Sequence, residues 1–230
     1  MLAGGKGINV SRIVHTLGGR TCALCLLGGR TGRAIGAALL AESIPAKVVR
    51  LAGESRSCIT IIDPEAHTQT EVNEPGPQVS PQELLRLLRA VRQSMRDMRP
   101  TWLALCGRMP VGIGDNFVGR IADECRKAGV WCAVDTSGPA LAEAVDRHVD
   151  LVKPNEAELG APDGSTDIHG RICGRCRAGA GVAIRRARCG DSWSPGRSLH
   201  GWVWRLVCAA AADLICQRAG LGRRLSGRLL

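Results

Sequence analysis

The chain has 230 residues, of which 45% are hydrophobic and 23% charged, and this composition is typical of a globular protein. The apolar content excludes disorder over most of the chain. The formal net charge of +10 is unevenly distributed. Residues 1–164 contain 19 Lys and Arg against 18 Asp and Glu, whereas residues 165–230 contain 12 Arg against 3 Asp. The composition therefore predicts a near-neutral globular domain, 1–164, and a divergent tail, 165–230, and it argues against a nucleic-acid-binding protein as a whole.

The start of the chain has no long apolar stretch of the kind found in secretory signals. Nor does any apolar segment approach the roughly 18 residues that a membrane span needs. We therefore expect a cytoplasmic protein with no membrane partner. The 11 cysteines are then expected to be reduced thiols rather than a disulfide framework.

Helical and strand patterns alternate from residue 8 to residue 152. Helices are predicted at 8–17, 31–41, 80–99, 116–127 and 139–146. Strands are predicted at 21–27, 47–51, 57–62, 102–105, 130–134 and 150–152. This alternation favours a parallel sheet covered by helices on both faces. Ligands on such sheets bind at the carboxyl ends of strands, which brings the loops 106–114, 135–138 and 153–158 to one edge.

The strongest helix signal begins at Ser80. Ser80 and Glu83 have the spacing of a capping box, and Pro81 takes the first helical position. Apolar residues then recur at intervals of four and three, at Leu84, Leu88, Val91, Met95 and Met98. We expect this stripe to face the core.

Two short segments have residue types suited to phosphate chemistry. Gly4-Gly5-Lys6-Gly7-Ile8-Asn9 opens a predicted helix, where free amides and a lysine favour an anion. A simple glycine-rich turn is the alternative. Asn155 and Glu158 lie three residues apart after a predicted strand, and an Asn N-cap with an acid at the third position explains this spacing equally well.

Five segments, taken in order, resemble the phosphofructokinase-B branch of the ribokinase-like sugar kinases, and the resemblance covers about 1–162. They are Ala3-Gly4-Gly5-Lys6-Gly7-Ile8-Asn9-Val10-Ser11, Glu71-Val72-Asn73-Glu74-Pro75-Gly76-Pro77, Cys106-Gly107-Arg108-Met109-Pro110-Val111-Gly112, Asp135-Thr136-Ser137-Gly138 and Leu151-Val152-Lys153-Pro154-Asn155-Glu156-Ala157-Glu158-Leu159. The second is similar to the 1-phosphofructokinase members in particular. The resemblance implies an α/β fold with a ribokinase-like, Rossmann-type sheet and a small β lid, here incomplete.

The resemblance also implies an ATP-dependent sugar-phosphate kinase that uses Mg²⁺. The implied reaction converts fructose 1-phosphate to fructose 1,6-bisphosphate, with tagatose 6-phosphate and fructose 6-phosphate as alternative substrates. The residues implied for the sugar phosphate are Gly5, Lys6, Gly7, Asn9 and Arg56. Those implied for the nucleotide are Lys153, Asn155, Glu158 and Gly190, with Glu158 also serving the metal. The implied catalytic base is Asp191, for which an incidental Gly-Asp in a loop is the alternative.

The chain also departs from the family pattern. It lacks the strand and substrate motif that precede the first glycine signature, and Cys106 and Arg108 replace both serines of a Ser-Gly-Ser loop. The stretch from Asn155 to Asp191 is short, and the strands that shape the nucleotide pocket have no evident counterpart. A single-base deletion would convert Ser-Leu-Val-Ala-Gly into the observed Ser-Trp-Ser-Pro-Gly at 192–196, so a frameshifted tail is our hypothesis. An inactive, truncated relative is therefore the competing interpretation.

Three further interpretations concern partners. Two C-x-x-C pairs, at 22–25 and 173–176, have a separation that argues against a zinc ribbon. The arginines of the tail come without a recognition fold, so no nucleic-acid partner is expected. Related kinases pair through a β lid, which we place at 47–72, and a homodimer is the expected assembly.

Overall fold

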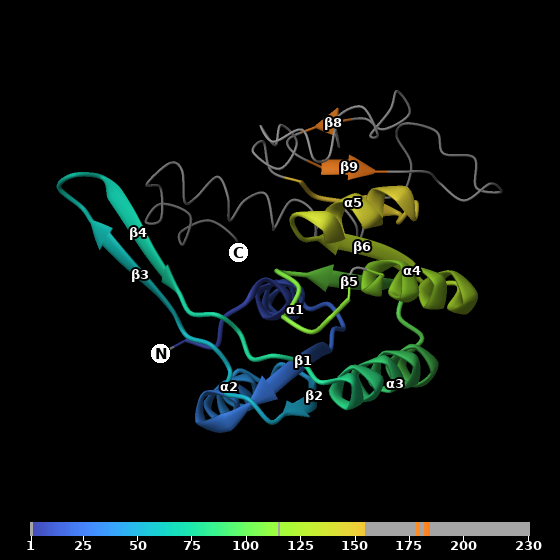
Figure 1. Cartoon of the computed structure of the whole chain (residues 1–230), viewed down its shortest axis with the longest axis horizontal. Coiled ribbons are helices and arrows are strands. Elements are labelled where there is room, and N and C mark those ends of the chain that lie inside the picture. Colours follow the sequence, from blue (N-terminus) through green and yellow to red (C-terminus); the bar gives the residue numbers. More distant parts are fainter. Residues whose placement is uncertain (1, 115, 155–177, 180–181, 185–230) are drawn as a thin grey trace.

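The computed structural model describes residues 2–114 and 116–154, together with the short strands at 178–179 and 182–184. Helices and strands alternate along the chain, as the sequence predicts (Figure 1). The helices are α1 Lys6–Thr16, α2 Gly29–Ala41, α3 Pro81–Met98, α4 Phe117–Ala128 and α5 Pro139–Asp146. The strands are β1 Ala23–Gly28, β2 Ala46–Leu51, β3 Cys58–Asp63, β4 Thr68–Asn73, β5 Trp102–Cys106, β6 Trp131–Asp135, β7 Leu151–Val152, β8 Ala178–Gly179 and β9 Val182–Ile184.

Strands β1 and β2 pair in parallel. Because successive side chains of a strand point to opposite faces, the two faces of β1 pack against two different hydrophobic cores. Ala23, Cys25 and Leu27 pack with Ile8 of α1 and Leu39 of α2. Leu24 and Leu26, from the other face of β1, pack against the larger core of the chain. The pair therefore joins the two hydrophobic cores.

The second sheet has the strand order β5-β6-β7-β9-β8. Strands β5, β6 and β7 are parallel, whereas β9 is antiparallel to both β7 and β8. The expectation of one parallel sheet is thus correct for 102–152. It is wrong elsewhere, because β1 and β2 form a separate sheet, β3 lies in an antiparallel hairpin and β9 is antiparallel. Strands β8 and β9 were not predicted, because two and three residues are too short to show a period.

The larger core lies between this sheet and helices α3, α4 and α5. Its most buried members include Val118, Ile121, Val134, Leu141 and Ala144, each at most 1% exposed. Truncating a buried Ile or Leu to Ala costs about 2–5 kcal/mol. These residues therefore fix the positions of the strand ends that carry the polar side chains described below.

Helix α3 begins as predicted. Ser80 caps it, with the capping box to Glu83 formed in both directions, and Pro81 is its first residue. Glu83 is 3% exposed and also accepts a hydrogen bond from the backbone nitrogen of Ala52, at 2.8 Å. Its pKa is lowered, first by the hydrogen bond from the Ser80 backbone. The predicted apolar stripe is wrong at its end, because Met98 is 41% exposed while Leu87 is buried instead.

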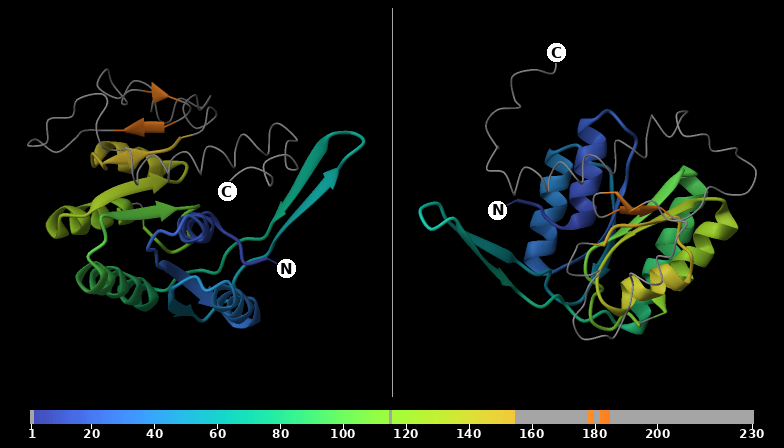
Figure 2. Two further views of the ribbon diagram at one scale, coloured as in Figure 1. Left: turned by 180° about the vertical axis from the view of Figure 1, so that it is seen from behind. Right: turned by 90° about the horizontal axis from the view of Figure 1, so that it is seen from above.

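Strands β3 and β4 form an antiparallel hairpin that projects from the rest of the chain (Figures 1 and 2). All twelve of its strand residues are exposed. The hairpin corresponds to the expected lid, but the predicted range of 47–72 needs correction. Residues 46–51 form β2 and belong to the core, so the lid comprises 58–73. Strand β4 was missed because its sequence, Thr-Gln-Thr-Glu-Val-Asn, has a single strongly apolar residue.

Candidate functional site

The carboxyl ends of β5, β6 and β7 lie at one edge, as the sequence predicts. The turn after β5 is tied to β6, since the backbone nitrogen of Gly107 donates to the carbonyl of Asp135 at 2.8 Å. The hydroxyl of Thr136, 1% exposed, donates to the carbonyl of Gly107, also at 2.8 Å. The backbone nitrogen of Lys153 donates to Val134 at 3.1 Å. These hydrogen bonds place Asp135 and Lys153 side by side.

Asp135 lies between two lysines. Its Oδ1 is 2.9 Å from the Nζ of Lys6 and 3.6 Å from the Nζ of Lys153. The side chains of Asp135 and Lys153 are each 19% exposed, whereas that of Lys6 is 51% exposed. The cluster carries one net positive charge at neutral pH, with one ammonium group open to solvent. Such a cluster suits a phosphorylated ligand.

The N-terminus of α1 lies open beside this cluster. Its N-cap is Gly5, whose φ of 115° is a conformation that essentially only glycine adopts. No side chain of the described residues caps this end, and its first turn contains no acidic residue. The first amides of a helix attract anions, and Lys6 starts the helix. This end of α1 therefore has both the donors and the charge for an anionic ligand.

Helix α2 also starts after a pair of glycines, but its N-terminus is closed. The carboxylate of Glu54 accepts from the backbone nitrogens of Arg30, at 3.0 Å, and Thr31, at 2.6 Å. These bonds lower the pKa of Glu54, with the one from Thr31 making the largest contribution. Two similar glycine-rich segments thus differ in the structure: within the described part of the chain, a carboxylate binds the backbone nitrogens at the start of α2 and none does so at the start of α1.

Arg56 follows a loop that hydrogen bonds hold at Ala52, Glu54 and Ser55. The backbone nitrogen of Ala52 donates a hydrogen bond to the carboxylate of Glu83, and the carboxylate of Glu54 accepts from the first turn of α2. The buried Ser55 accepts from the backbone nitrogen of Gly28 through its hydroxyl and donates to the carbonyl of Gly28 through its own backbone nitrogen, both at 3.0 Å. Arg56 itself is exposed, and its guanidinium has no ion pair or hydrogen bond within the described part of the chain. A rigid loop with a free guanidinium at its end is well arranged to bind phosphate.

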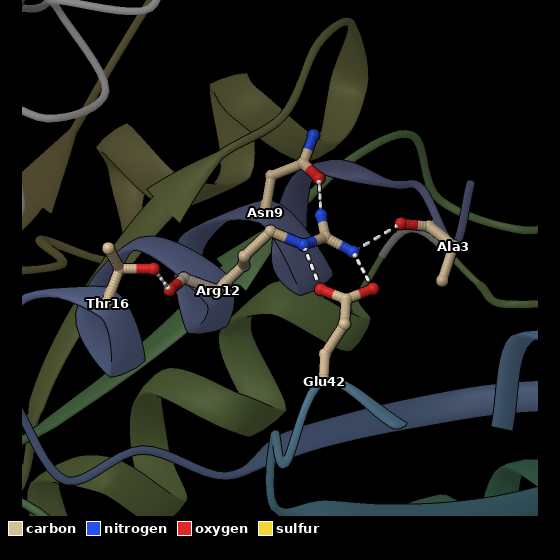
Figure 3. Close-up of polar contacts among 5 residues, drawn as sticks. All are labelled: Ala3, Asn9, Arg12, Thr16 and Glu42. Atoms are coloured by element: carbon tan, nitrogen blue, oxygen red, sulfur yellow. Dashed lines mark hydrogen bonds and ion pairs between the residues drawn. The ribbon is translucent and has the colours of Figure 1, made fainter. Parts of the chain in front are cut away.

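Asn9 lies on the first turns of α1 and is held by a second arginine (Figure 3). The Nη1 of Arg12 donates to the Oδ1 of Asn9 at 2.7 Å. The same guanidinium contacts Ala3 and Glu42, which lie outside α1. The amide of Asn9 is therefore fixed before any ligand binds.

Cys106 replaces a polar residue at the end of β5, close to the lysines. Burial raises the pKa of its thiol to about 12, with the charge of Asp135 as a second cause. The thiol therefore stays protonated at neutral pH and is a poor nucleophile. The exposed Arg108, two residues further on, contributes a cation to the same loop.

Lys6 and Lys153 are brought together by Asp135. Gly7 and Asn9 lie on the same helix as Lys6, and Gly5 is its N-cap. Arg56 belongs to the neighbouring loop after β2, and no contact joins it to the lysines in the described part of the chain. The remaining predicted site residues lie outside the described residues; they are Asn155, Glu158, Gly190 and Asp191.

The roles of Asp135, Arg12 and Glu54 were not predicted. The sequence could have indicated Asp135, since this residue directly follows a predicted strand at the expected ligand edge. Arg12 had a weaker signal, because it lies three residues after Asn9 on the same helix. Glu54 had none, because its partners are 23 and 24 residues away.

The fold and the charges at its strand ends define a protein suited to phosphorylated small molecules. Residues 1–169 match the pfkB family of carbohydrate kinases, and the chain belongs to this family. The chain is 37% identical to the 1-phosphofructokinase of Rhodobacter capsulatus over 164 residues, which are 71% of this chain and 52% of that protein.

Solved structures agree with this assignment. The crystal structure of phosphofructokinase-2 from Escherichia coli in complex with fructose 6-phosphate aligns with a TM-score of 0.64 and 28% identity. The alignment covers 74% of this chain and 57% of that chain. The tetrameric inhibited form of the same enzyme has a TM-score of 0.63 over the same shares. The chain thus spans about half the length of these relatives. Among the described helices, none is long and apolar enough to cross a membrane.

Proposed function

We propose that the chain binds fructose 1-phosphate and supports its ATP-dependent phosphorylation to fructose 1,6-bisphosphate. The observation that carries this choice of substrate is the 37% identity to a 1-phosphofructokinase. Fructose 6-phosphate is the first alternative, because a similar structure contains that sugar. Tagatose 6-phosphate is the second.

The described residues supply the sugar-phosphate half of the proposed site. Lys6 and the N-terminus of α1 attract the ligand, since no side chain of the described residues caps that end and its first turn contains no acidic residue. Arg56 presents a free guanidinium for bidentate pairing with the phosphate. Gly5 and Gly7 allow the ligand to approach the backbone, and Asn9 offers an amide to a sugar oxygen.

The nucleotide half of the proposed site is assigned to Lys153, Asn155, Glu158 and Gly190. Lys153 already lies beside Asp135, at the strand edge where ligands bind in such sheets. Oxygen ligands such as carboxylates suit Mg²⁺, and the proposal gives this role to Glu158. A Mg²⁺ ion held there would neutralise charge on the nucleotide phosphates. Asp191 is proposed to accept the proton of the attacking sugar hydroxyl.

A binding and turnover experiment tests this proposal. Isothermal titration of the full chain with the three sugar phosphates should give the tightest binding for fructose 1-phosphate, and a coupled ADP assay should report turnover. Lys6→Met should weaken sugar-phosphate binding at least tenfold. Lys127→Met is the matched control, because Lys127 is an exposed lysine on α4 that pairs with Glu124 instead of Asp135. Absence of binding by the native chain would refute the proposal.

Weak or absent turnover with intact sugar binding favours the competing function, that of an inactive relative which only binds its ligand. The frameshift hypothesis gives one physical route to this outcome, since it concerns the segment that holds the proposed base. The family match ends at residue 169, close to the boundary of 164 where the charge balance changes. Reading the nucleotide sequence across codons 164–196 tests the frameshift hypothesis, because a restored reading frame must encode family-like sequence.

We further propose a homodimer through the β3–β4 hairpin. Directly paired residues share a face of a hairpin, so Ile59, Ile61 and Val72 lie together on one face. These side chains are 57%, 57% and 50% exposed. A second copy of this chain would cover this apolar face, and the tetrameric form of phosphofructokinase-2 supports self-association within the family.

A further inference from the structure

One guanidinium joins three segments of the chain beside the proposed sugar site (Figure 3). Besides its bond to Asn9, the Nη2 of Arg12 donates to the carbonyl of Ala3 at 2.7 Å. The carboxylate of Glu42 accepts from the Nε of Arg12 at 2.5 Å and from its Nη2 at 3.0 Å. Arg12 therefore holds the residue before the glycine pair, the amide of Asn9 and the end of α2 at the same time.

The chemistry of arginine decides which way the amide of Asn9 points. A guanidinium can only donate hydrogen bonds, so only the oxygen of Asn9 can face it. The NH₂ group is then turned away from Arg12, as Figure 3 shows. An amide fixed in this way presents donors alone, and a donor pair suits the hydroxyl or phosphate oxygens of a sugar phosphate.

The position of Glu42 argues for a role besides helix stability. Glu42 is the C-cap of α2, and a carboxylate at the C-terminus of a helix is at the unfavourable end of its dipole. Pairing with Arg12 compensates for this, and it lowers the pKa of Glu42. Glu42 in turn takes two of the guanidinium's donors, which fixes the plane of the remaining ones.

We propose that Arg12, oriented by Glu42, is a positioning residue for sugar-phosphate binding. It turns the NH₂ of Asn9 towards the ligand and holds the backbone at Ala3, ahead of the helix start. The inference rests on the proposed function and adds to it the Arg12–Glu42 pair, which orients Asn9 and does not itself contact the ligand. Residues that only orient a binding group are worth about 10–100-fold in the comparable case of metal sites.

The test is Arg12→Lys in the full chain, with Arg92→Lys as the matched control. Arg92 forms the same kind of bidentate pair, with its Nε and Nη2 at 2.9 and 3.0 Å from the carboxylate of Glu124, and it too joins two helices. That pair contacts no residue of the proposed site in the described part of the chain. Lysine keeps the charge in both variants but lacks the planar fork.

Titration with fructose 1-phosphate should show an increase in Kd of about tenfold for Arg12→Lys. Arg92→Lys should stay within twofold of the native chain, and the affinity of both variants for a non-hydrolysable ATP analogue should be unchanged. In an Asn9→Ala background, Arg12→Lys should have a much smaller effect, because residues in one network are not additive. That non-additivity separates positioning from a general loss of structure.

Equal sugar affinity of the two lysine variants would overturn the inference, as would a full, additive effect of Arg12→Lys in the Asn9→Ala background. If Arg12→Lys does not fold, Glu42→Gln takes its place, and native-like affinity of that variant would overturn the inference. A native chain that binds none of the sugar phosphates refutes the proposed function, and this result is seen before any variant is made.

Discussion

Glu54 lies across the start of α2, with its Oε1 2.6 Å from the backbone nitrogen of Thr31. The carboxylate thereby fills an anion-binding position that the corresponding end of α1 leaves open. It also anchors the loop that carries Arg56. The side chain of Glu54 thus binds the first amides of α2 and also fixes the loop that carries the Arg56 guanidinium to the neighbouring site.

This relationship predicts how Glu54→Gln changes stability with pH. The folded state lowers the pKa of Glu54, so its contribution is present above the unfolded pKa, about 4.3. It is lost as the pH falls through the lower, folded value. Thermal unfolding should therefore show a lower Tm for Glu54→Gln at pH 7, with the difference shrinking towards pH 3.

The control for Glu54 is Glu65→Gln in the hairpin turn. The side chain of Glu65 is exposed and makes no ion pair or hydrogen bond in the described part of the chain. Its substitution should leave the Tm unchanged at both pH values. A Glu54→Gln difference that persists undiminished at pH 3 would contradict the role of the carboxylate.

The two glycines at the start of α1, Gly5 and Gly7, should respond differently to substitution by alanine. Gly5→Ala forces a side chain into a φ of 115° and should destabilise the chain by about 1–3 kcal/mol. At Gly7 an added Cβ would lie 3.9 Å from the Cβ of Cys106, an ordinary contact. Gly7→Ala should therefore keep the stability within about 1 kcal/mol yet weaken sugar-phosphate binding, because the proposal has the ligand approach the backbone at Gly7 and a side chain would hinder that approach.

Urea unfolding and titration calorimetry measure these two effects separately. The prediction for Gly7 fails if binding stays native, since the glycine would then serve only the turn. The prediction for Gly5 fails if its alanine variant is as stable as the native chain.

The cysteines should differ in their rates of alkylation. Burial raises the thiol pKa of Cys106 to about 12 and that of Cys25 to about 11, so few thiolates form at pH 8. Cys58 is exposed on β3. Timed labelling with iodoacetamide, read by peptide mass spectrometry, should modify Cys58 first. Labelling of Cys106 as fast as that of Cys58 would show that its environment is more open than the structure indicates.

The hairpin dimer predicts a difference between two faces of one strand. Ile61→Asp places a charge on the apolar face with Ile59 and Val72 and should shift the protein towards the monomer. Ile62→Asp, whose side chain is 69% exposed on the opposite face, should leave the assembly unchanged. Sedimentation velocity distinguishes the two variants. Equal behaviour of both would exclude this face as the interface.

Local patterns predicted most of the fold. The alternation of helices and strands, the capping box at Ser80 and the common edge formed by the carboxyl ends of β5, β6 and β7 are confirmed. Patterns failed where an element was short or its neighbours were distant. Strands β8 and β9 are too short for a period, and β2 could not be assigned to the core rather than the lid without its partner β1.

The charges of the chain also divide into those that the sequence explains by itself and those that need the tertiary structure. The sequence by itself separated a near-neutral segment with five family-like motifs from an arginine-rich tail, because composition and motif order need no three-dimensional information. Only the tertiary structure decided that Asp135 joins Lys6 and Lys153, that Glu54 closes α2, and that Arg12 and Glu42 hold Asn9. Several of these partners are 23 to 129 residues apart, and hydrogen bonds of 2.6–2.9 Å depend on packing that no local pattern encodes.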